Sequence, residues 1–243
     1  MRLLCWNTNR GRGTDAALVL AEESGADIVF LQETVPPPQW GSARVGDVVP
    51  GNAWGSWVLS RAGQITPLVL PGYSGWTAGG LLQGLSGADD PICVFSIHSP
   101  THTKYAPRKK YVYESRRIVQ EIAALAPDGC RVIIAGDFNI TLGERTASEG
   151  IALSTAESRT LAEYRDLGFM IAWRDSRPHD PLAQTLRWTK DRTKPFHCDG
   201  YLVRGFVAAE VECAVLEGES FTSMSDHNPV VCELNVPAVQ PGT

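Results

Sequence analysis

Six strand-like stretches of this sequence begin or end at an ionisable or amide side chain. One of them, VIIAGDFN, carries Asp137 and Asn139 two residues apart, so both side chains lie on one face of an extended segment and can contact the same group. The other five supply Asn7 in LLCWNTN, Glu33 in IVFLQET, His98 in ICVFSIH, Asp199 in HCDGYLV, and Asp226 with His227 in SDHNPVV. Sheet scaffolds commonly assemble a site from polar residues at the ends of separate strands.

The chemistry of this set is coherent. Hard oxygen ligands are offered by Glu33, Asp137, Asp226 and Asn7. Such ligands are preferred by Mg²⁺ and Mn²⁺, whereas zinc prefers Cys and His. Histidine is the natural general acid or transition-state stabiliser near neutral pH. The combination predicts metal-assisted transfer of a phosphoryl group to water. The sequence contains no GxSxG elbow, and no P-loop or GxGxxG follows a strand-like stretch.

Each of these residues also has a purely structural interpretation. Glu33 can be a surface loop residue, Asp226 can cap a turn ahead of Pro229, and a histidine at a strand end is often a hydrogen-bonded core group. Because six separate stretches show the same feature at their ends, we favour the functional interpretation for the set.

The charge distribution is uneven. The net charge is −5, from 22 basic and 27 acidic residues, which argues against a protein that coats nucleic acid. Segment 104–117 nevertheless holds six basic residues against Glu114, and segment 187–197 holds four against Asp191. Two basic segments on an otherwise acidic protein would suit a substrate that carries phosphate. Alternatively, the two segments are simply the solvated start of a helix and a solvated loop.

The length of 243 residues, with 43% hydrophobic and 20% charged residues, predicts one domain over 1–236 and a flexible tail at 237–243. The N-terminal segment lacks the pattern of a signal peptide, and no apolar run of about 18 residues is present, so we expect no membrane segment. The six cysteines form no CxxC motif and are predicted to be free thiols of a cytoplasmic protein.

Apolar runs predict more strands than helices. Strands are expected at 2–6, 27–31, 56–60, 66–70, 92–97, 131–136, 198–203, 206–216 and 229–234, and helices at 14–24, 109–126 and 154–168. A purely parallel βαβ sheet would have nearly equal numbers. The pattern therefore favours two packed sheets with helices on the outer faces, and the Gly- and Pro-rich segments 34–55 and 71–91 are predicted to be long loops.

The ordered set WNTN, LQET, WVLSR, SIHSP, GDFN, CDGYLV and SDHNPV resembles the endonuclease/exonuclease/phosphatase superfamily, over residues 5 to about 232. That superfamily includes deoxyribonucleases of the pancreatic type, exonuclease III-like repair enzymes, neutral sphingomyelinases and inositol polyphosphate 5-phosphatases. The resemblance implies a four-layer α/β sandwich, in which two packed, mostly antiparallel sheets are flanked by helices. This fold agrees with the excess of strands.

The resemblance also implies roles for individual residues. Glu33 is expected to be the main ligand of Mg²⁺, for which Mn²⁺ can substitute, with Asn7 and Asp226 contributing to the metal site. Asp137 is expected to orient or deprotonate the attacking water, and Asn139 to hold the phosphate or that water.

The two histidines receive different roles from the resemblance. Asp199 is expected to orient His227, which would stabilise the pentacovalent phosphorane. Abasic-site enzymes of the exonuclease III type carry a tyrosine where this chain has His98, whereas deoxyribonuclease- and sphingomyelinase-like members carry histidine. His98 therefore argues against a dedicated abasic-site endonuclease and is a candidate proton donor to the leaving oxygen.

Four further residues are weaker candidates for substrate binding: Trp188, Arg108, Lys109 and Arg116. The leading hypothesis is a monomeric, Mg²⁺-dependent nuclease that acts on DNA, with RNA as a second polynucleotide substrate. An alternative keeps the chemistry but changes the substrate to a small phosphoester, such as an inositol phosphate, a nucleotide or a lipid head group. A third hypothesis, a binding module with a decayed site, is disfavoured because none of the key positions is missing.

Overall fold

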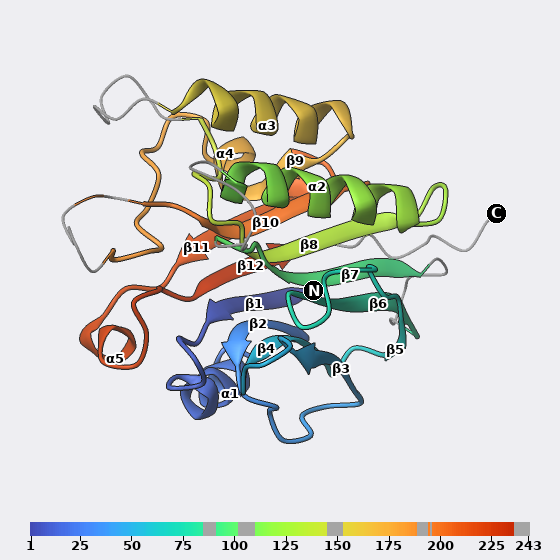
Figure 1. Cartoon of the computed structure of the whole chain (residues 1–243), viewed down its shortest axis with the longest axis vertical. Helices are drawn as coiled ribbons and strands as arrows, with labels where there is room; N and C mark the ends of the chain where they lie inside the picture. Colours follow the sequence, from blue (N-terminus) through green and yellow to red (C-terminus); the bar gives the residue numbers. More distant parts are fainter. Residues whose placement is uncertain (85–90, 102–109, 145–152, 189–193, 195, 236–243) are drawn as a thin grey trace.

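The computed structural model describes residues 1–84, 91–101, 110–144, 153–188, 194 and 196–235. The predicted tail at 237–243 and the candidate residues Arg108 and Lys109 lie outside these ranges. Within them, twelve strands form two six-stranded sheets that pack face to face (Figure 1). No helix in the described ranges has the length and apolar character needed to cross a membrane.

The first sheet contains both ends of the described chain. Its order is β11 (Val211–Val215), β12 (Val230–Leu234), β1 (Arg2–Asn7), β2 (Ile28–Thr34), β4 (Gly55–Ser60) and β3 (Ala43–Val48). Only the β1–β2 pair is parallel, and the other four pairs are antiparallel.

The second sheet has the same mixed character. Its order is β5 (Gln64–Pro67), β6 (Thr77–Gln83), β7 (Ile92–His98), β8 (Arg131–Asp137), β10 (Asp199–Arg204) and β9 (Met170–Ile171). The parallel pair is β7–β8, and the remaining pairs are antiparallel.

Helices cover the outer faces of both sheets (Figure 1). α2 (Lys110–Leu125) and α3 (Thr155–Asp166) pack on the second sheet, whereas α1 (Thr14–Glu23) packs on the first. A capping box fixes the start of α3, because the Ser154 hydroxyl accepts from the backbone N–H of Glu157 while the Glu157 carboxylate accepts from that of Ser154. The short helices are α4 (Ala172–Ser176), α5 (Glu219–Thr222) and a 3₁₀ turn at Ala208–Glu210.

The main core lies between the sheets. Leu3 and Cys5 of β1 point toward the second sheet, where they pack with Ile133 and Tyr201, while the intervening Leu4 points toward α1. Strands buried on both faces need apolar residues at successive positions, which explains the continuous apolar runs in the sequence. The predicted four-layer α/β sandwich is confirmed, and all six cysteines are free, as predicted.

The structure corrects the interpretation of 34–55 and 71–91 as long loops, because these segments contain β3 and β6. In β6 the two glycines allow neighbouring strands to approach closely. A Cβ atom on Gly79 would lie 2.1 Å from the carbonyl oxygen of Val94, and one on Gly80 would lie 2.0 Å from that of Thr66. Glycine therefore marks close strand packing here, not a turn.

The other predicted elements agree to within a few residues, with two exceptions. The strand expected at 66–70 lies at Gln64–Pro67, and the one expected at 206–216 begins at Val211, after the 3₁₀ turn. The three long helices occur where the sequence predicts them, at Thr14–Glu23, Lys110–Leu125 and Thr155–Asp166. The short elements β9, α4 and α5 are too brief for a periodic signal.

Candidate active site

Three of the predicted residues form a row across the second sheet. His98 at the end of β7 is in register with Asp137 at the end of β8, and Asp137 is in register with Asp199 at the start of β10. β7 and β8 approach closely beside this row, because a Cβ atom on Gly136 would lie 1.9 Å from the carbonyl oxygen of Ile97. Glycine at position 136 thus permits the alignment of His98 with Asp137.

The first sheet contributes Asn7 and Glu33 to the same place. Asn7 ends β1, and its Nδ2 donates a hydrogen bond of 3.1 Å to Oδ2 of Asp137 across the two sheets. Burial raises the pKa of Glu33, and the neighbouring Asn7 side chain offsets part of that rise. The ends of β1, β2, β7, β8 and β10 therefore converge on one polar site.

Backbone strain is concentrated at this site. In the part of the chain that the structure describes, positive φ at a non-glycine residue occurs at four positions: Asn9, Arg10, Glu33 and Asn139. Glu33 has a φ of +47° and lies within a register shift between Leu31 and Thr34. Strained conformations and bulges of this kind often direct a side chain into a functional site.

The Glu33 carboxylate is partly buried. Its two ion-pair neighbours lie beyond hydrogen-bond distance, with Nε of Arg10 at 3.8 Å and Nε2 of His98 at 3.7 Å. Burial raises the pKa of Glu33, and the Asp226 carboxylate raises it further, whereas His227 lowers it.

Asp137 is almost fully buried at the centre of the site. Its Oδ1 accepts a 2.9 Å hydrogen bond from the backbone N–H of Asn139, and its Oδ2 lies 3.8 Å from Nε2 of both His98 and His227. Burial raises the pKa of Asp137, and the nearby Asp199 carboxylate adds to the rise. A carboxylate with a raised pKa is a better proton acceptor than an ordinary surface aspartate.

His227 is held by Asp199. Its Nδ1 lies 3.0 and 2.9 Å from the two carboxylate oxygens of Asp199. Burial alone lowers the pKa of His227, but the carboxylates of Asp199 and Asp137 outweigh burial and raise it to about 10. The imidazole is therefore charged at neutral pH, with Nδ1–H donating to Asp199 and Nε2 turned toward Asp137.

Hydroxyl groups fix both members of this pair. The Thr185 hydroxyl accepts from the backbone N–H of Cys198 and of Asp199, at 2.9 and 3.0 Å. The Ser225 hydroxyl accepts from the backbone N–H of His227 at 3.0 Å and donates to the carbonyl oxygen of Asn7 at 2.7 Å. The Ser225 bridge connects the segment before β12 to the end of β1.

His98 has a different environment. Its ring contacts Trp76 and Trp54, at centroid distances of 5.2 and 5.7 Å, and its Nδ1 has no hydrogen-bond partner among the described residues. Burial lowers the pKa of His98 to about 4, outweighing the opposite effect of Asp137. The imidazole is therefore neutral at pH 7, and its Nε2 faces the carboxylates of Glu33 and Asp137.

Asn139 follows Asp137 with a φ of +53°. Its Nδ2 donates a 2.7 Å hydrogen bond to the carbonyl oxygen of Ser99, in the SIHSP stretch. Its backbone N–H is already donated to Asp137. The amide is thus held at the rim of the site, beside a cavity of about 280 Å³.

The structure places the weaker candidates in different positions. Trp188 is partly exposed and lines the cavity beside Asn139. Arg116 lies away from that cavity, between α2 and α3, where its Nη1 is 3.2 Å from Oε1 of Glu163. Arg108 and Lys109 lie outside the described residues. Asp226 is partly exposed, and its carbonyl oxygen accepts a hydrogen bond from the backbone N–H of Arg187 at 2.8 Å.

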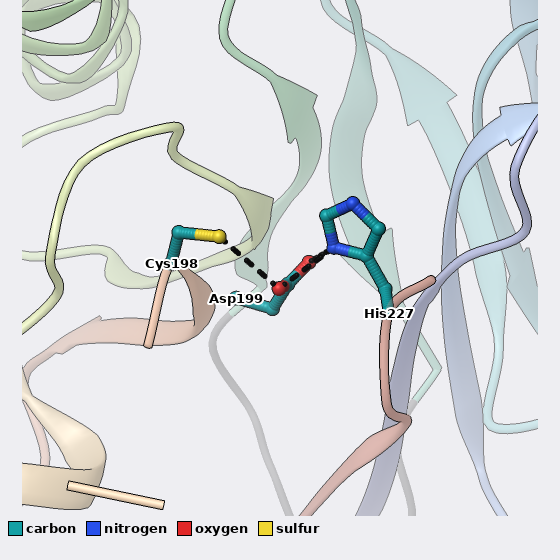
Figure 2. A group of neighbouring side chains, drawn as sticks. All are labelled: Cys198, Asp199 and His227. Atoms are coloured by element: carbon teal, nitrogen blue, oxygen red, sulfur yellow. Dashed lines mark hydrogen bonds and ion pairs between the residues drawn. The ribbon is translucent and has the colours of Figure 1, made fainter. Parts of the chain in front are cut away.

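Two groups of side chains have metal-ligand chemistry. In the first, Cys198, Asp199 and His227 bring their ligand atoms within 4.8 Å of one another (Figure 2). Burial raises the pKa of the Cys198 thiol well above its usual range, and Nδ1 of His227 is engaged by Asp199. Because a metal needs a thiolate and an unprotonated imidazole nitrogen, this group fits a hydrogen-bonded dyad better than a metal site.

The second group consists of Glu33, Asn7 and Asp226. These side chains offer carboxylate and amide oxygens, the donors that Mg²⁺ and Mn²⁺ prefer. The Glu33 carboxylate is partly buried, and its oxygens lie 3.8 Å from Nε of Arg10 and 3.7 Å from Nε2 of His98, beyond hydrogen-bond distance. The chemistry of these donors fits a hard divalent cation.

Sequence reasoning missed several residues that build the site: Trp54, Trp76, Ser99, Thr185 and Ser225. Ser99 and Ser225 lie inside the SIHSP and SDHNPV stretches, so the sequence could have identified them. Trp54 and Trp76 lie in the Gly- and Pro-rich segments interpreted as loops, where no periodic pattern points to a site.

Comparisons with known proteins identify the family and the fold. The pattern that defines the Endonuclease/Exonuclease/phosphatase family matches residues 4–227. An AP endonuclease from Archaeoglobus fulgidus superposes with a TM-score of 0.72 at 15% identity, covering 97% of this chain and 100% of its own. The 3′ phosphatase NExo from Neisseria, bound to product DNA hairpin, superposes with a TM-score of 0.72 at 17% identity, with the same coverage of both chains. A search of the curated proteins finds no significant match.

Proposed function

Because the chain belongs to the endonuclease/exonuclease/phosphatase family, and is thus a phosphoric ester hydrolase of that type, we propose that it is a metal-dependent nuclease. In this proposal, water attacks the phosphorus of a phosphodiester in DNA, and RNA is a second substrate. The observation that supports it best is the position of Asp137, which lies between a charged His227 and a neutral His98 and is hydrogen-bonded to Asn7.

The oxygen donors of Glu33, Asn7 and Asp226 would hold Mg²⁺, or Mn²⁺ in its place. When bound, such a cation supplies positive charge that polarises the phosphoryl oxygen and neutralises the charge that develops on it. Burial raises the pKa of Glu33, because it disfavours the charged carboxylate. A nearby cation would oppose this effect and favour the ionised form.

Asp137 accepts a proton from the attacking water. Its raised pKa suits it to this role, and its hydrogen bonds from Asn7 and from the backbone of Asn139 keep the carboxylate oriented. The side-chain amide of Asn139, held by the carbonyl of Ser99, lies at the rim, where it can contact the phosphate.

The two histidines act on opposite sides of the phosphorus. His227 is charged and donates from Nε2 to a phosphoryl oxygen, while Asp199 holds Nδ1 and keeps the ring protonated. Burial lowers the pKa of His98 to about 4, so the ring is neutral at pH 7. His98 stabilises the leaving oxygen through a hydrogen bond from Nε2, and the proton that this oxygen takes up comes from solvent water.

The substrate part of the proposal has independent support. Two structures with the same fold are described as an AP endonuclease and as a 3′ phosphatase bound to product DNA hairpin, so this fold is used on DNA. A small phosphoester is the second candidate substrate, favoured by the net charge of −5.

Incubation with single- and double-stranded DNA and RNA, with Mg²⁺ and with EDTA, tests the function. We expect Mg²⁺-dependent cleavage of at least one polynucleotide. Asp137→Asn protein purified in the same way serves as the control for contaminating nucleases. If no polynucleotide is cut but a small phosphoester releases phosphate, the second candidate replaces the first.

A further inference from the structure

Two tryptophans flank His98. The rings of Trp54 and Trp76 pack edge to face at a centroid distance of 5.7 Å, and both contact the His98 ring. Both side chains are partly exposed. They form an aromatic surface at the edge of the active site, which we call the His98-side surface.

Both sheets contribute to this surface. Trp54 directly precedes β4 of the first sheet, and Trp76 directly precedes β6 of the second. The Ser56 hydroxyl donates to the carbonyl oxygen of Trp76 at 3.0 Å, and the backbone N–H of His98 donates to the same oxygen at 2.8 Å. The backbone of Trp76 is thus bonded both to β4 and to His98.

A second aromatic surface lies beyond Asn139. The cavity of about 280 Å³ is lined by Trp188, Phe196 and Tyr111, together with Leu186 and Asn139. The rings of Trp188 and Phe196 pack edge to face at 5.9 Å, and Trp188 is partly exposed. We call this the Asn139-side cavity.

Strand order places the two surfaces on opposite sides of Asp137. The order β6–β7–β8–β10 puts Trp76 before β6, His98 at the end of β7, Asp137 at the end of β8 and Cys198 just before β10. Neighbouring strands are about 5 Å apart, so Trp76 lies roughly two strand spacings from Asp137. Cys198, which lines the Asn139-side cavity, lies about one spacing away on the other side.

We propose that the His98-side surface and the Asn139-side cavity receive the two nucleobases on either side of the scissile phosphate in a single-stranded nucleic acid. This inference rests on the proposed function and specifies its substrate. Aromatic side chains bind single strands by stacking on successive bases, and such stacking tolerates different sequences because every base has a π-face.

A duplex fits this arrangement less well. Its bases are stacked on one another and paired, so they reach an aromatic side chain only after costly unstacking. Non-specific binding to a duplex also depends on many contacts between basic residues and phosphates, and this chain has a net charge of −5. Stacking supplies affinity that does not depend on positive charge.

The first experiment removes bases from the substrate and leaves the protein intact. Short single-stranded oligonucleotides carry one cleavable phosphodiester between methylphosphonate linkages, with the base present or omitted on either side of it. We expect kcat/KM to fall about tenfold to a hundredfold for each omitted base, and a complementary strand to lower it further. Equal rates for all single-stranded substrates, or faster cleavage of the duplex, would overturn the inference.

The second experiment combines base removal with Trp54→Ala and Trp76→Ala. If Trp54 stacks on a base, its removal slows cleavage of the full substrate but has little effect once that base is omitted, and Trp54→Phe restores most of the rate. If the tryptophans only hold His98 in place, every substrate loses the same factor, which would contradict the stacking role. Tyr113→Ala, which removes an exposed aromatic ring on α2, should leave all rates unchanged.

These outcomes separate the two proposals. Cleavage of polynucleotides without any dependence on the flanking bases refutes the stacking surfaces and leaves the nuclease assignment intact. Hydrolysis of small phosphoesters alone, with every oligonucleotide uncut, refutes both.

Discussion

The two halves of the candidate site hold the same side chain in opposite electrostatic states. In the half built from β10 and the segment before β12, Asp199 binds Nδ1 of His227, and the carboxylates raise the pKa of His227 to about 10. In the half built from β7, His98 packs against two tryptophans, and burial lowers its pKa to about 4. Both rings lie 3.8 Å from the same oxygen of Asp137.

The difference shows that the surroundings of a histidine, and not its distance to the central carboxylate, determine its protonation. A charged ring stabilises negative charge on a phosphoryl oxygen, whereas a neutral ring can only share a hydrogen bond. Four predictions, from the largest expected effect to the smallest, test this contrast.

Removal of the metal should have the largest effect, because both halves act on a phosphate that the cation is proposed to hold. EDTA should reduce cleavage to the level of the Asp137→Asn control, and Mg²⁺ or Mn²⁺ should restore it. Isothermal titration should show that Glu33→Gln weakens Mg²⁺ binding, while Glu217→Gln, an exposed position, binds like the wild type. Full activity in EDTA would contradict the metal site.

The charged half should contribute more than the neutral half. We expect His227→Ala to lower kcat by about 10⁴-fold, as for groups that act as a unit in other hydrolases. Asp199→Asn should produce a similar loss, because it removes the charge that keeps His227 protonated. Circular dichroism checks that the fold persists, and near-native turnover in either variant would refute these roles.

The neutral half should show a smaller loss. We expect His98→Gln to lower kcat by about 10²-fold, since glutamine retains a hydrogen-bond donor, and His98→Ala to lower it further. The comparison of the two variants measures the value of that donor. A loss for His98→Gln as large as that for His227→Ala would remove the distinction between the halves.

Stability should respond to pH with opposite signs in the two halves. An unperturbed histidine has a pKa of about 6.5. The raised pKa of His227 gives a stabilising contribution that is complete below about pH 6.5 and is lost as pH rises through about 10. The lowered pKa of His98 gives a contribution that is complete above about pH 6.5 and is lost as pH falls through about 4.

Denaturant unfolding of the metal-free protein at a series of pH values measures this effect. His227→Gln should reduce the loss of unfolding free energy on the alkaline side, and His98→Gln should reduce the loss on the acid side. His179→Gln, at an exposed position, serves as the control and should change neither side. A wild-type pH dependence in both variants would show that the two environments do not differ as described.

The sequence predicts which side chains converge, but not how their surroundings tune them. Asp137 and Asn139 share a strand end and a face, so their joint position follows from strand geometry. The pairing of Asp199 with His227 follows from the family resemblance. The contrast between the histidines could not be predicted, because it depends on burial and on which carboxylates face each ring.

The aromatic contacts of His98 illustrate the same limit. Trp54 and Trp76 precede strands of different sheets, and the hydrogen bond from Ser56 to the carbonyl of Trp76 joins the two segments. Their segments are rich in glycine, a composition typical of loops, whereas Gly79 and Gly80 permit close strand packing. A contact between two sheets leaves no periodic pattern in either segment.

The geometry of the site depends on Gly136, although this residue contributes no functional group. This residue has no side chain to bind substrate, yet it lets β7 and β8 approach closely enough to align His98 with Asp137. An added methyl group there would push the two strands apart and spoil that alignment without deleting any functional atom. A mutational survey that scores only activity would count this glycine among the catalytic groups, although its contribution is the space it leaves empty.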